Sequence, residues 1–162
     1  MKKFLLVCLI ALVAIGVYAD SNNKWTYSKD YGLYHLTSDI AFLTENNMEV
    51  CEDEEILMTF SKVGDDIGVI FAFDEKFNLG GITNVTYADS IDTIDETGTP
   101  FEVIYSGEES IALSIEDSYF IYMDMLSSTQ KMFAFVNVND SSTYVLFNVN
   151  CKDLYKYRAY LK

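Results

Sequence analysis

Short runs of β-branched and aromatic residues alternate with polar turns along most of the chain. Residues 56–63 form one such run, Gly64, Asp65 and Asp66 form a turn, and residues 67–73 form the next run, with apolar side chains at every second position. This alternation predicts a β-hairpin, because successive side chains of a strand point to opposite faces. The same pattern predicts further strands at residues 82–88, 101–105, 110–115, 119–126, 131–138, 143–149 and 154–161.

The spacing of these runs indicates the fold class. Their links are only a few residues long, which favours an antiparallel meander, and helix is expected only as a short turn at residues 38–46, where Ser38 and Asp39 precede an apolar group. About eight to ten sequential strands leave two exposed edges unless the sheet closes on itself. We therefore expect an all-β protein whose antiparallel meander closes into a barrel, with a two-sheet β-sandwich of the same strands as the alternative.

The N-terminal end has the pattern of a secretory signal peptide. Lys2 and Lys3 precede an apolar run at residues 4–17, and Ala19 ends a cleavage site of the small-residue type. We therefore predict a leader at residues 1–19 and a single domain at residues 20–162. No later apolar stretch is long enough to predict a membrane span, so we expect a secreted, extracellular protein.

Composition narrows the range of partners. Without the predicted leader the chain has nine basic and 25 acidic residues, a formal net charge of −16. Such a charge repels nucleic acid and anionic membrane surfaces, so no nucleic-acid partner is expected. Half of all residues are apolar and 15% are aromatic, which indicates a folded chain with a sizeable core.

Two modifications are predicted from motifs of a secreted chain. Cys51 and Cys151 are the two cysteines outside the leader, and an even number in an oxidising compartment predicts a disulfide between them. The alternative is two free thiols that serve an intermolecular bridge or a catalytic centre. Asn84 and Asn139 each begin a glycosylation sequon, which has this meaning only if the source is eukaryotic.

Three features at the ends of the chain point to a family. The only tryptophan, Trp25, follows the predicted cleavage site closely; Asp140 and Tyr144 stand four residues apart between two apolar runs; and Arg158 is the only arginine. This layout resembles the lipocalins, small secreted barrels of the calycin group, with Asn23 where that family has a glycine. The resemblance implies a barrel that holds a hydrophobic ligand inside, and an Arg158 side chain that stacks on Trp25 at the closed end.

A barrel of about eight strands has an interior that is either filled by side chains or able to hold one small ligand. Several predicted strands are apolar on both faces. The residues of these strands that could line such a cavity are Phe71, Phe73, Tyr122, Met123, Asp124, Phe133 and Phe135. Asp124 is a charged residue within an apolar run. An inward position for it requires a cationic partner or a ligand amine, whereas an outward position makes it an ordinary surface acid.

The chain has no catalytic signature. Its single histidine, His35, lies among apolar neighbours, and we interpret it as a hydrogen-bonded structural residue. Nucleophilic catalysis of the triad type requires an imidazole beside a nucleophile, and zinc sites require several His and Cys ligands. We therefore expect no enzyme activity, no metal and no cofactor.

Two functional hypotheses lead, and an enzyme that uses two carboxylates converging in a cleft comes third. The first is a secreted lipocalin-like protein that carries or sequesters a small hydrophobic or amphipathic molecule. The second is a secreted interaction module or inhibitor with a filled core, whose acidic surface binds a protein partner. An interior void favours the first, and a dense core with an exposed apolar or acidic patch favours the second.

Overall fold

The computed structural model describes residues 24–29, 32–44, 47–51, 54–73, 80–136 and 143–160. The predicted leader and Asn139 lie outside these ranges. The strands are β1 (Trp25–Ser28), β2 (Gly32–Thr37), β3 (Ile40–Leu43), β4 (Met48–Cys51), β5 (Ile56–Val63), β6 (Asp66–Phe73), β7 (Asn84–Ala88), β8 (Thr99–Ser106), β9 (Ser110–Leu113), β10 (Gln130–Val136) and β11 (Tyr144–Asn150). The helices are α2 (Ile91–Thr97), α3 (Ile115–Met125) and the 3-10 helix η2 (Leu154–Tyr157).

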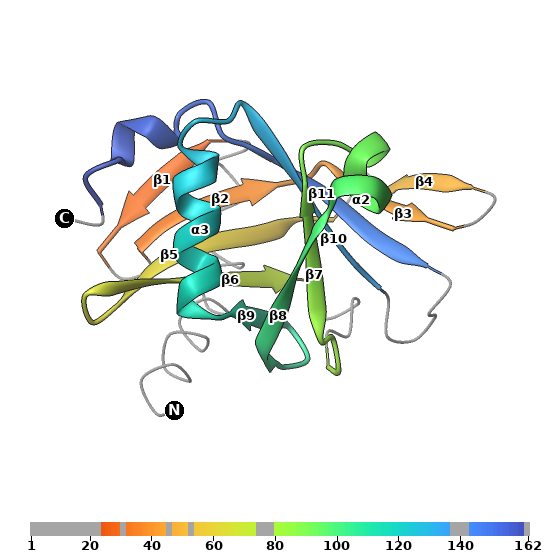
Figure 1. Cartoon of the computed structure of the whole chain (residues 1–162), viewed down its shortest axis with the longest axis horizontal. Coiled ribbons are helices and arrows are strands. Elements are labelled where there is room, and N and C mark those ends of the chain that lie inside the picture. The colour runs from red at the N-terminus through yellow and green to blue at the C-terminus, as the bar shows by residue number, and fades with distance from the viewer. Residues whose placement is uncertain are drawn as a thin grey trace.

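All eleven strands belong to one sheet with the order β1-β2-β5-β6-β9-β8-β7-β10-β11-β3-β4 (Figure 1). Every pair of neighbours is antiparallel, as the sequence predicts. The expected closed barrel is wrong, because the sheet ends in two edges, β1 and β4, and the alternative of two separate sheets is not found either. The protein is mostly antiparallel β structure with few helices.

The sheet coils so strongly that its first strands approach β11 without pairing with it. β2 and β3 are separated only by Ser38 and Asp39, yet they stand near opposite ends of the sheet order. Side chains bridge the gap: Trp25 Nε1 donates to the Asn150 carbonyl at 2.8 Å, and Thr37 Oγ1 donates to the Asn148 carbonyl at 2.6 Å. Side-chain hydrogen bonds therefore join β1 and β2 to β11 where a closed barrel has a backbone ladder.

The predicted hairpin at residues 56–73 is confirmed. β5 pairs with β6 from Ile56 opposite Phe73 to Val63 opposite Asp66, so the loop consists of Gly64 and Asp65. Gly64 has φ of +75°, the left-handed conformation that two-residue hairpin loops require and that glycine adopts without steric cost. The predicted strands at 82–88, 101–105, 110–115, 131–138 and 143–149 correspond to β7, β8, β9, β10 and β11 with shifted ends.

Three local predictions are wrong. Residues 119–126 lie in helix α3, residues 154–161 contain η2 where a closing strand was expected, and residues 38–46 contain strand β3 where a helical turn was expected. α3 is capped at its N-terminus by Ser114, whose Oγ accepts from the Asp117 amide at 3.0 Å. Residues 119–126 are apolar at every position except Asp124, so the two-residue period of a strand cannot be distinguished there from helical spacing.

Phenylalanine rings fill the centre of the coiled sheet. Phe71 and Phe73 come from β6, Phe133 and Phe135 from β10, and Phe147 from β11. The Phe71 and Phe133 ring centroids are 5.0 Å apart, those of Phe73 and Phe135 are 5.1 Å apart, and Phe133 stacks on Phe147 at 5.3 Å. Because β6 and β10 are not neighbours in the sheet, the Phe71–Phe133 and Phe73–Phe135 contacts join strands across the interior, whereas Phe133 and Phe147 lie on paired strands.

His35 is a core residue without hydrogen bonds. Its side chain is fully buried on β2, its ring lies 5.1 Å from that of Trp25, and neither ring nitrogen has a hydrogen-bond partner. The expected structural role therefore stands, but the expected hydrogen bonding is wrong. Burial without compensation favours the neutral imidazole and lowers the pKa of His35 to about 4.

Substitution of Phe147 is the most direct test of this core, since its ring contacts rings from both β6 and β10. We expect Phe147→Ala to lower the free energy of unfolding by about 3 to 5 kcal/mol, because it leaves a cavity between the two sides of the sheet. Tyr155→Ala, at an exposed position, is the control and should change stability by less than about 0.5 kcal/mol. Urea titration measures both. Equal effects of the two substitutions would contradict a core centred on Phe147.

His35 should make folding sensitive to acid. The ordinary pKa of 6.5 applies to the unfolded chain and about 4 to the folded one, so the unfolded state binds more protons between these values. The free energy of unfolding should therefore fall as the pH is lowered from about 6.5 to about 4, with a His35 contribution of about 3 kcal/mol. His35→Leu removes this contribution. Urea titrations across this range should show the wild-type curve falling more steeply than that of the variant, and parallel curves would refute the assignment.

Candidate functional site

The residues predicted to line a cavity are placed unequally. Phe71, Phe73, Tyr122, Phe133 and Phe135 are buried in the core, whereas Met123 is 46% exposed and does not face the interior. Tyr122 lies in van der Waals range of Phe60, with ring centroids 5.0 Å apart, and its hydroxyl donates to the Tyr157 carbonyl at 2.7 Å. Rings at these separations are in contact, so no ligand fits between them.

Asp124 has its cationic partner within the chain. Asp124 Oδ2 accepts from the Tyr87 hydroxyl at 2.7 Å and lies 2.6 Å from Lys131 Nζ, which in turn lies 2.5 Å from Asp89 Oδ1. The Lys131 ammonium also lies 5.0 Å from the centroid of the Tyr87 ring. These four groups join the end of α3 to β7 and β10, and no ligand amine is needed to neutralise the carboxylate.

The titration of this cluster follows from its contacts. Partial burial by itself raises the pKa of Asp124, but hydrogen bonds from Lys131 and Tyr87 outweigh it and hold the pKa below its usual value. Burial likewise lowers the pKa of Lys131, but its bonds to Asp124 and Asp89 raise it more. Burial and the adjacent Asp124 carboxylate raise the pKa of Tyr87. Near neutral pH the cluster is therefore an ion pair with a neutral phenol.

The two cysteines do not form the predicted disulfide. Cys51 and Cys151 are both free thiols. Cys51 pairs with Ile40, which pairs with Phe147, and Cys151 lies four residues beyond Phe147 along the chain. The two cysteines are therefore two strands apart across the sheet and four residues apart along the strand direction. This offset separates their Cα atoms by about 16 Å, more than twice the Cα–Cα distance that a disulfide allows. Burial raises the pKa of the Cys151 thiol to about 12.

Trp25 and Arg158 do not form the contact that the lipocalin resemblance implies. Trp25 stacks on Phe60 with centroids 5.3 Å apart, while Arg158 is exposed at the end of η2. No cation–π contact joins the two residues, both of which the structure describes. Asn84 of the first sequon is exposed at the start of β7, and the prediction that it is glycosylated stays untested.

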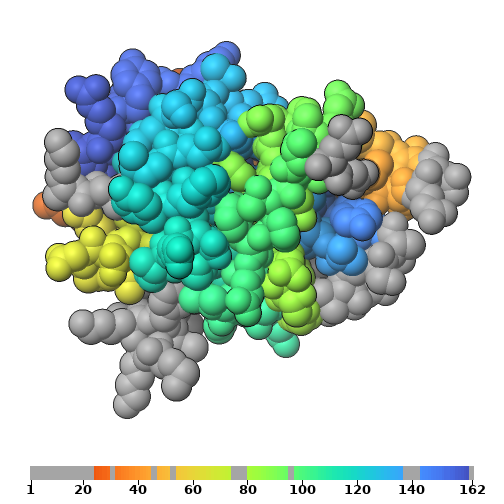
Figure 2. Space-filling model, in the orientation of Figure 1, coloured from red at the N-terminus to blue at the C-terminus, as the bar shows by residue number. Residues whose placement is uncertain are grey.

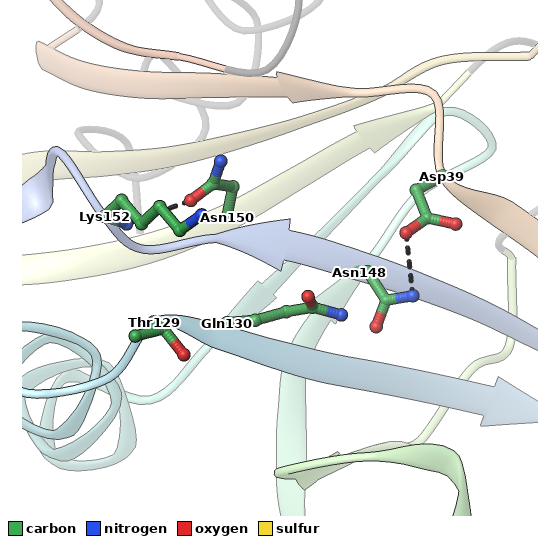
Figure 3. Close-up of a pocket in the computed structure, with 6 residues that line it drawn as sticks. All are labelled: Asp39, Thr129, Gln130, Asn148, Asn150 and Lys152. Atoms are coloured by element: carbon green, nitrogen blue, oxygen red, sulfur yellow. Dashed lines mark hydrogen bonds between the residues drawn. The ribbon is translucent and has the colours of Figure 1, made fainter.

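One pocket is polar and lies on the outer face of β10 and β11 (Figure 3). It has a volume of about 240 Å³ and is lined by Asp39, Thr129, Gln130, Asn148, Asn150 and Lys152. Asn148 Nδ2 donates to Asp39 at 2.8 Å, whereas Asn148 Oδ1 is buried without a partner. The amide and hydroxyl groups of this pocket could hold a small polar molecule or ordered water.

A second pocket of about 310 Å³ lies where the β5–β6 turn meets the start of α3. Its lining combines carboxylates with apolar side chains and consists of Asp65, Asp66, Ile67, Ile115, Glu116 and Tyr119. Phe120 and Met123 on the same helix are also exposed, and Phe120 packs against Phe101 at 5.8 Å. Like the polar pocket, this one opens on the surface and contains none of the residues predicted to line an internal cavity.

An exposed apolar row crosses four strands at the opposite end of the outer face from the polar pocket. The strand register places Val136 opposite Tyr144, Tyr144 opposite Leu43, and Leu43 opposite Met48. Val136 is 40%, Tyr144 45% and Met48 52% exposed, and Val50, two positions from Met48, is 60% exposed. We call these five residues the edge surface. Since directly paired residues share a face, the edge surface is continuous and reaches the open edge of the sheet.

Helix α2 divides this outer face. Ile94, with Ile91 beside it, packs on Ala88, Met132, Ala134 and Leu146, so the middle of the face is covered. Beyond α2 the β3–β4 hairpin extends to one end of the molecule (Figure 1), where it lies at the periphery of the molecular surface (Figure 2). Apart from Leu43, which packs against this cluster, the edge surface is therefore one part of this face that α2 leaves open.

The chain segment that contains β3 and β4 carries charge of one sign. From Asp30 to Ser61 the sequence contains eight acidic residues and no lysine or arginine. Glu49, between Met48 and Val50, is exposed. Partial burial, and after it the charges of Glu54 and Glu49, raise the pKa of the Cys51 thiol at the end of β4. A partner at the β4 edge therefore meets the apolar edge surface on one face of the strand and the Glu49 carboxylate on the other.

Sequence reasoning missed the edge surface. β4 was not predicted as a strand, although Met48, Glu49, Val50 and Cys51 alternate apolar and polar at period two over a short run. That signal was available, but the alignment of Tyr144 and Val136 with Met48 depends on pairing between distant strands. Only the three-dimensional register reveals the row.

Comparison with known proteins finds no significant match to this chain among protein-family models, curated proteins or solved structures. The resemblance to the lipocalins stays a prediction. Within the part of the chain that the structure describes, no helix has the length and apolar character to span a bilayer. In that same part, no group of three or more His, Cys, Asp or Glu side chains is arranged to hold a metal ion.

The Lys131 cluster predicts a graded response to substitution. Lys131 is only 7% exposed, so Lys131→Met should lower the free energy of unfolding by about 1 to 3 kcal/mol, because Asp124 loses its counter-charge. Combining it with Asp124→Asn should restore part of that loss, since the partly buried Asp124 carboxylate is then gone and the remaining Asp89 carboxylate is solvated. Asp89→Asn is the control and should cost less than about 1 kcal/mol, because the Asp89 side chain is 77% exposed. Chemical denaturation measures all three. Full wild-type stability of Lys131→Met would contradict a structural role for the pair.

Proposed function

We propose that this chain is a protein-recognition module that binds a basic partner protein through the edge surface. The observation that carries the proposal is the continuous row from Val136 through Tyr144 and Leu43 to Met48, which ends at the open β4 edge. Contiguous exposed apolar surface rimmed by polar residues is typical of interaction sites. Tyrosine and methionine, both exposed in this row, are residue types enriched in protein interfaces.

The packed interior supports recognition at the surface over transport of an internal ligand. A carrier of a hydrophobic molecule requires an enclosed, mostly apolar space. Here the rings of Phe71, Phe73, Phe133, Phe135 and Phe147 occupy the centre of the sheet, with centroids 5.0 to 6.4 Å apart. A ligand could enter between these described rings only by displacing them, because they are already buried against one another.

Electrostatics supports a basic partner. The chain carries a formal net charge of −14, and all the charged residues of the segment that contains β3 and β4 are acidic. Complementary charge accelerates encounter and disfavours acidic competitors. The N-terminal leader pattern adds the proposal that this recognition takes place outside the cell.

Panning of a random peptide library displayed on phage tests this function on the immobilised full chain. We expect enriched peptides to combine basic and apolar residues, and their affinity to fall at least about tenfold in Tyr144→Ser, as for a central interface residue. Tyr155→Ser is the matched control, because it removes an equally exposed tyrosine outside the edge surface.

Native mass spectrometry of the same preparation tests the carrier hypothesis. A small molecule released in stoichiometric amount on denaturation, together with peptide binding that is absent or unaffected by Tyr144→Ser, would overturn the proposal. A ligand-free mass with Tyr144-dependent peptide binding would support it.

A further inference from the structure

Among the described residues, no strand pairs with the outer edge of β4, whose main-chain groups follow a defined pattern. The β3–β4 hairpin is closed by the Thr44 amide, which donates to the Asn47 carbonyl at 2.8 Å. In an antiparallel pair, hydrogen-bonded and non-bonded residue pairs alternate. Glu49 opposite Phe42 is therefore a bonded pair that faces β3, whereas the N–H and C=O groups of Met48 and Val50 point away from β3.

On the basis of the proposed function, we propose that β4 accepts an extended basic segment of the partner as a twelfth, antiparallel strand of the sheet. No described strand pairs with β4 on that side. Two partner residues opposite Met48 and Val50 can each exchange both main-chain bonds, which supplies four hydrogen bonds. Strand addition of this kind derives affinity from the main chain and specificity from alternate side chains.

The register specifies the side chains of the added strand. Residues opposite Met48 and Val50 extend the edge surface and therefore need apolar side chains, because directly opposite residues share a face. The residue between them lies opposite Glu49, which is exposed, so a lysine or arginine there forms a cross-strand ion pair. The recognised pattern is apolar, basic, apolar, with further basic residues on either side to match the acidic segment.

Charge argues against a second copy of this chain as the occupant. Antiparallel pairing of two β4 strands would bring together two copies of residues 45–55, each with six acidic and no basic residues. Like charges on directly paired strands are destabilising, and acidic side chains on an edge strand discourage such pairing. A basic segment converts the same charges into attraction.

A fluorescent peptide with the core Lys-Val-Lys-Val-Lys, flanked by serines, tests the proposal by anisotropy with the full chain. N-methylation of both valines removes the two donors that face β4 and should weaken binding at least about tenfold, whereas N-methylation of the two outer lysines should leave it within about threefold. Glu49→Lys should also weaken binding about tenfold or more. Glu116→Lys, the same change at an exposed site on α3, is the control.

Amide hydrogen exchange supplies a second readout. Peptide binding should slow exchange at Met48 and Val50 and leave Glu49, whose amide already faces β3, almost unchanged. A peptide that binds in a Tyr144-dependent way but tolerates valine N-methylation would overturn strand addition and leave the proposed function intact. Absence of any Tyr144-dependent binding would overturn the proposed function itself. Concentration-dependent self-association that protects Met48 and Val50 without peptide would assign the edge to a second copy and overturn the proposal.

Discussion

The contact of Phe147 with rings from β6 and β10 determines the shape of this protein. Sequential antiparallel strands could form a flat sheet, but Phe71 and Phe133 meet only if the sheet coils until its distant strands face each other. Burial of each aromatic side chain contributes about 1.5 to 3 kcal/mol, and ring contacts add to this. The coil then brings β1 and β2 beside β11, where Trp25 and Thr37 donate hydrogen bonds to its carbonyl groups.

A filled centre shifts recognition to the outside of the sheet. The inner face is occupied by side chains from the sheet itself and from α3, whose Ile121, Tyr122 and Met125 join the core. The outer face of β10, β11 and β3 is covered by α2 only in its middle. A polar pocket and an apolar edge are thereby left at its two ends, and the apolar end coincides with unpaired backbone at β4.

The distribution of charge also favours recognition at the β4 edge. Lys131 is buried and neutralised by Asp124 and Asp89, so it contributes little to the surface field. Around β3 and β4, acidic residues have no basic neighbours in sequence. An edge strand of this kind resists pairing with itself and attracts a basic strand, because both effects depend on the same carboxylates.

The sequence by itself determined the local β structure and the identity of the core. Alternation at residues 56–73 predicted β5 and β6. All the aromatic residues proposed for the interior are buried, whereas the two other candidates, Met123 and Asp124, are not. Local spacing is sufficient for these features because a strand has a fixed two-residue period.

Only the tertiary structure decided the features that depend on distant pairing. The run before Leu126 became a helix because the Ser114 cap and the core positions of Ile121, Tyr122 and Met125 suit helical spacing. Cys51 and Cys151 are held apart by the sheet register. Tyr144 aligns with Met48 across a residue separation that no local pattern records, and Lys131 meets Asp124 where the chain turns from α3 into β10. These features follow from which strands pair, and in what register, as the sheet coils around its aromatic centre.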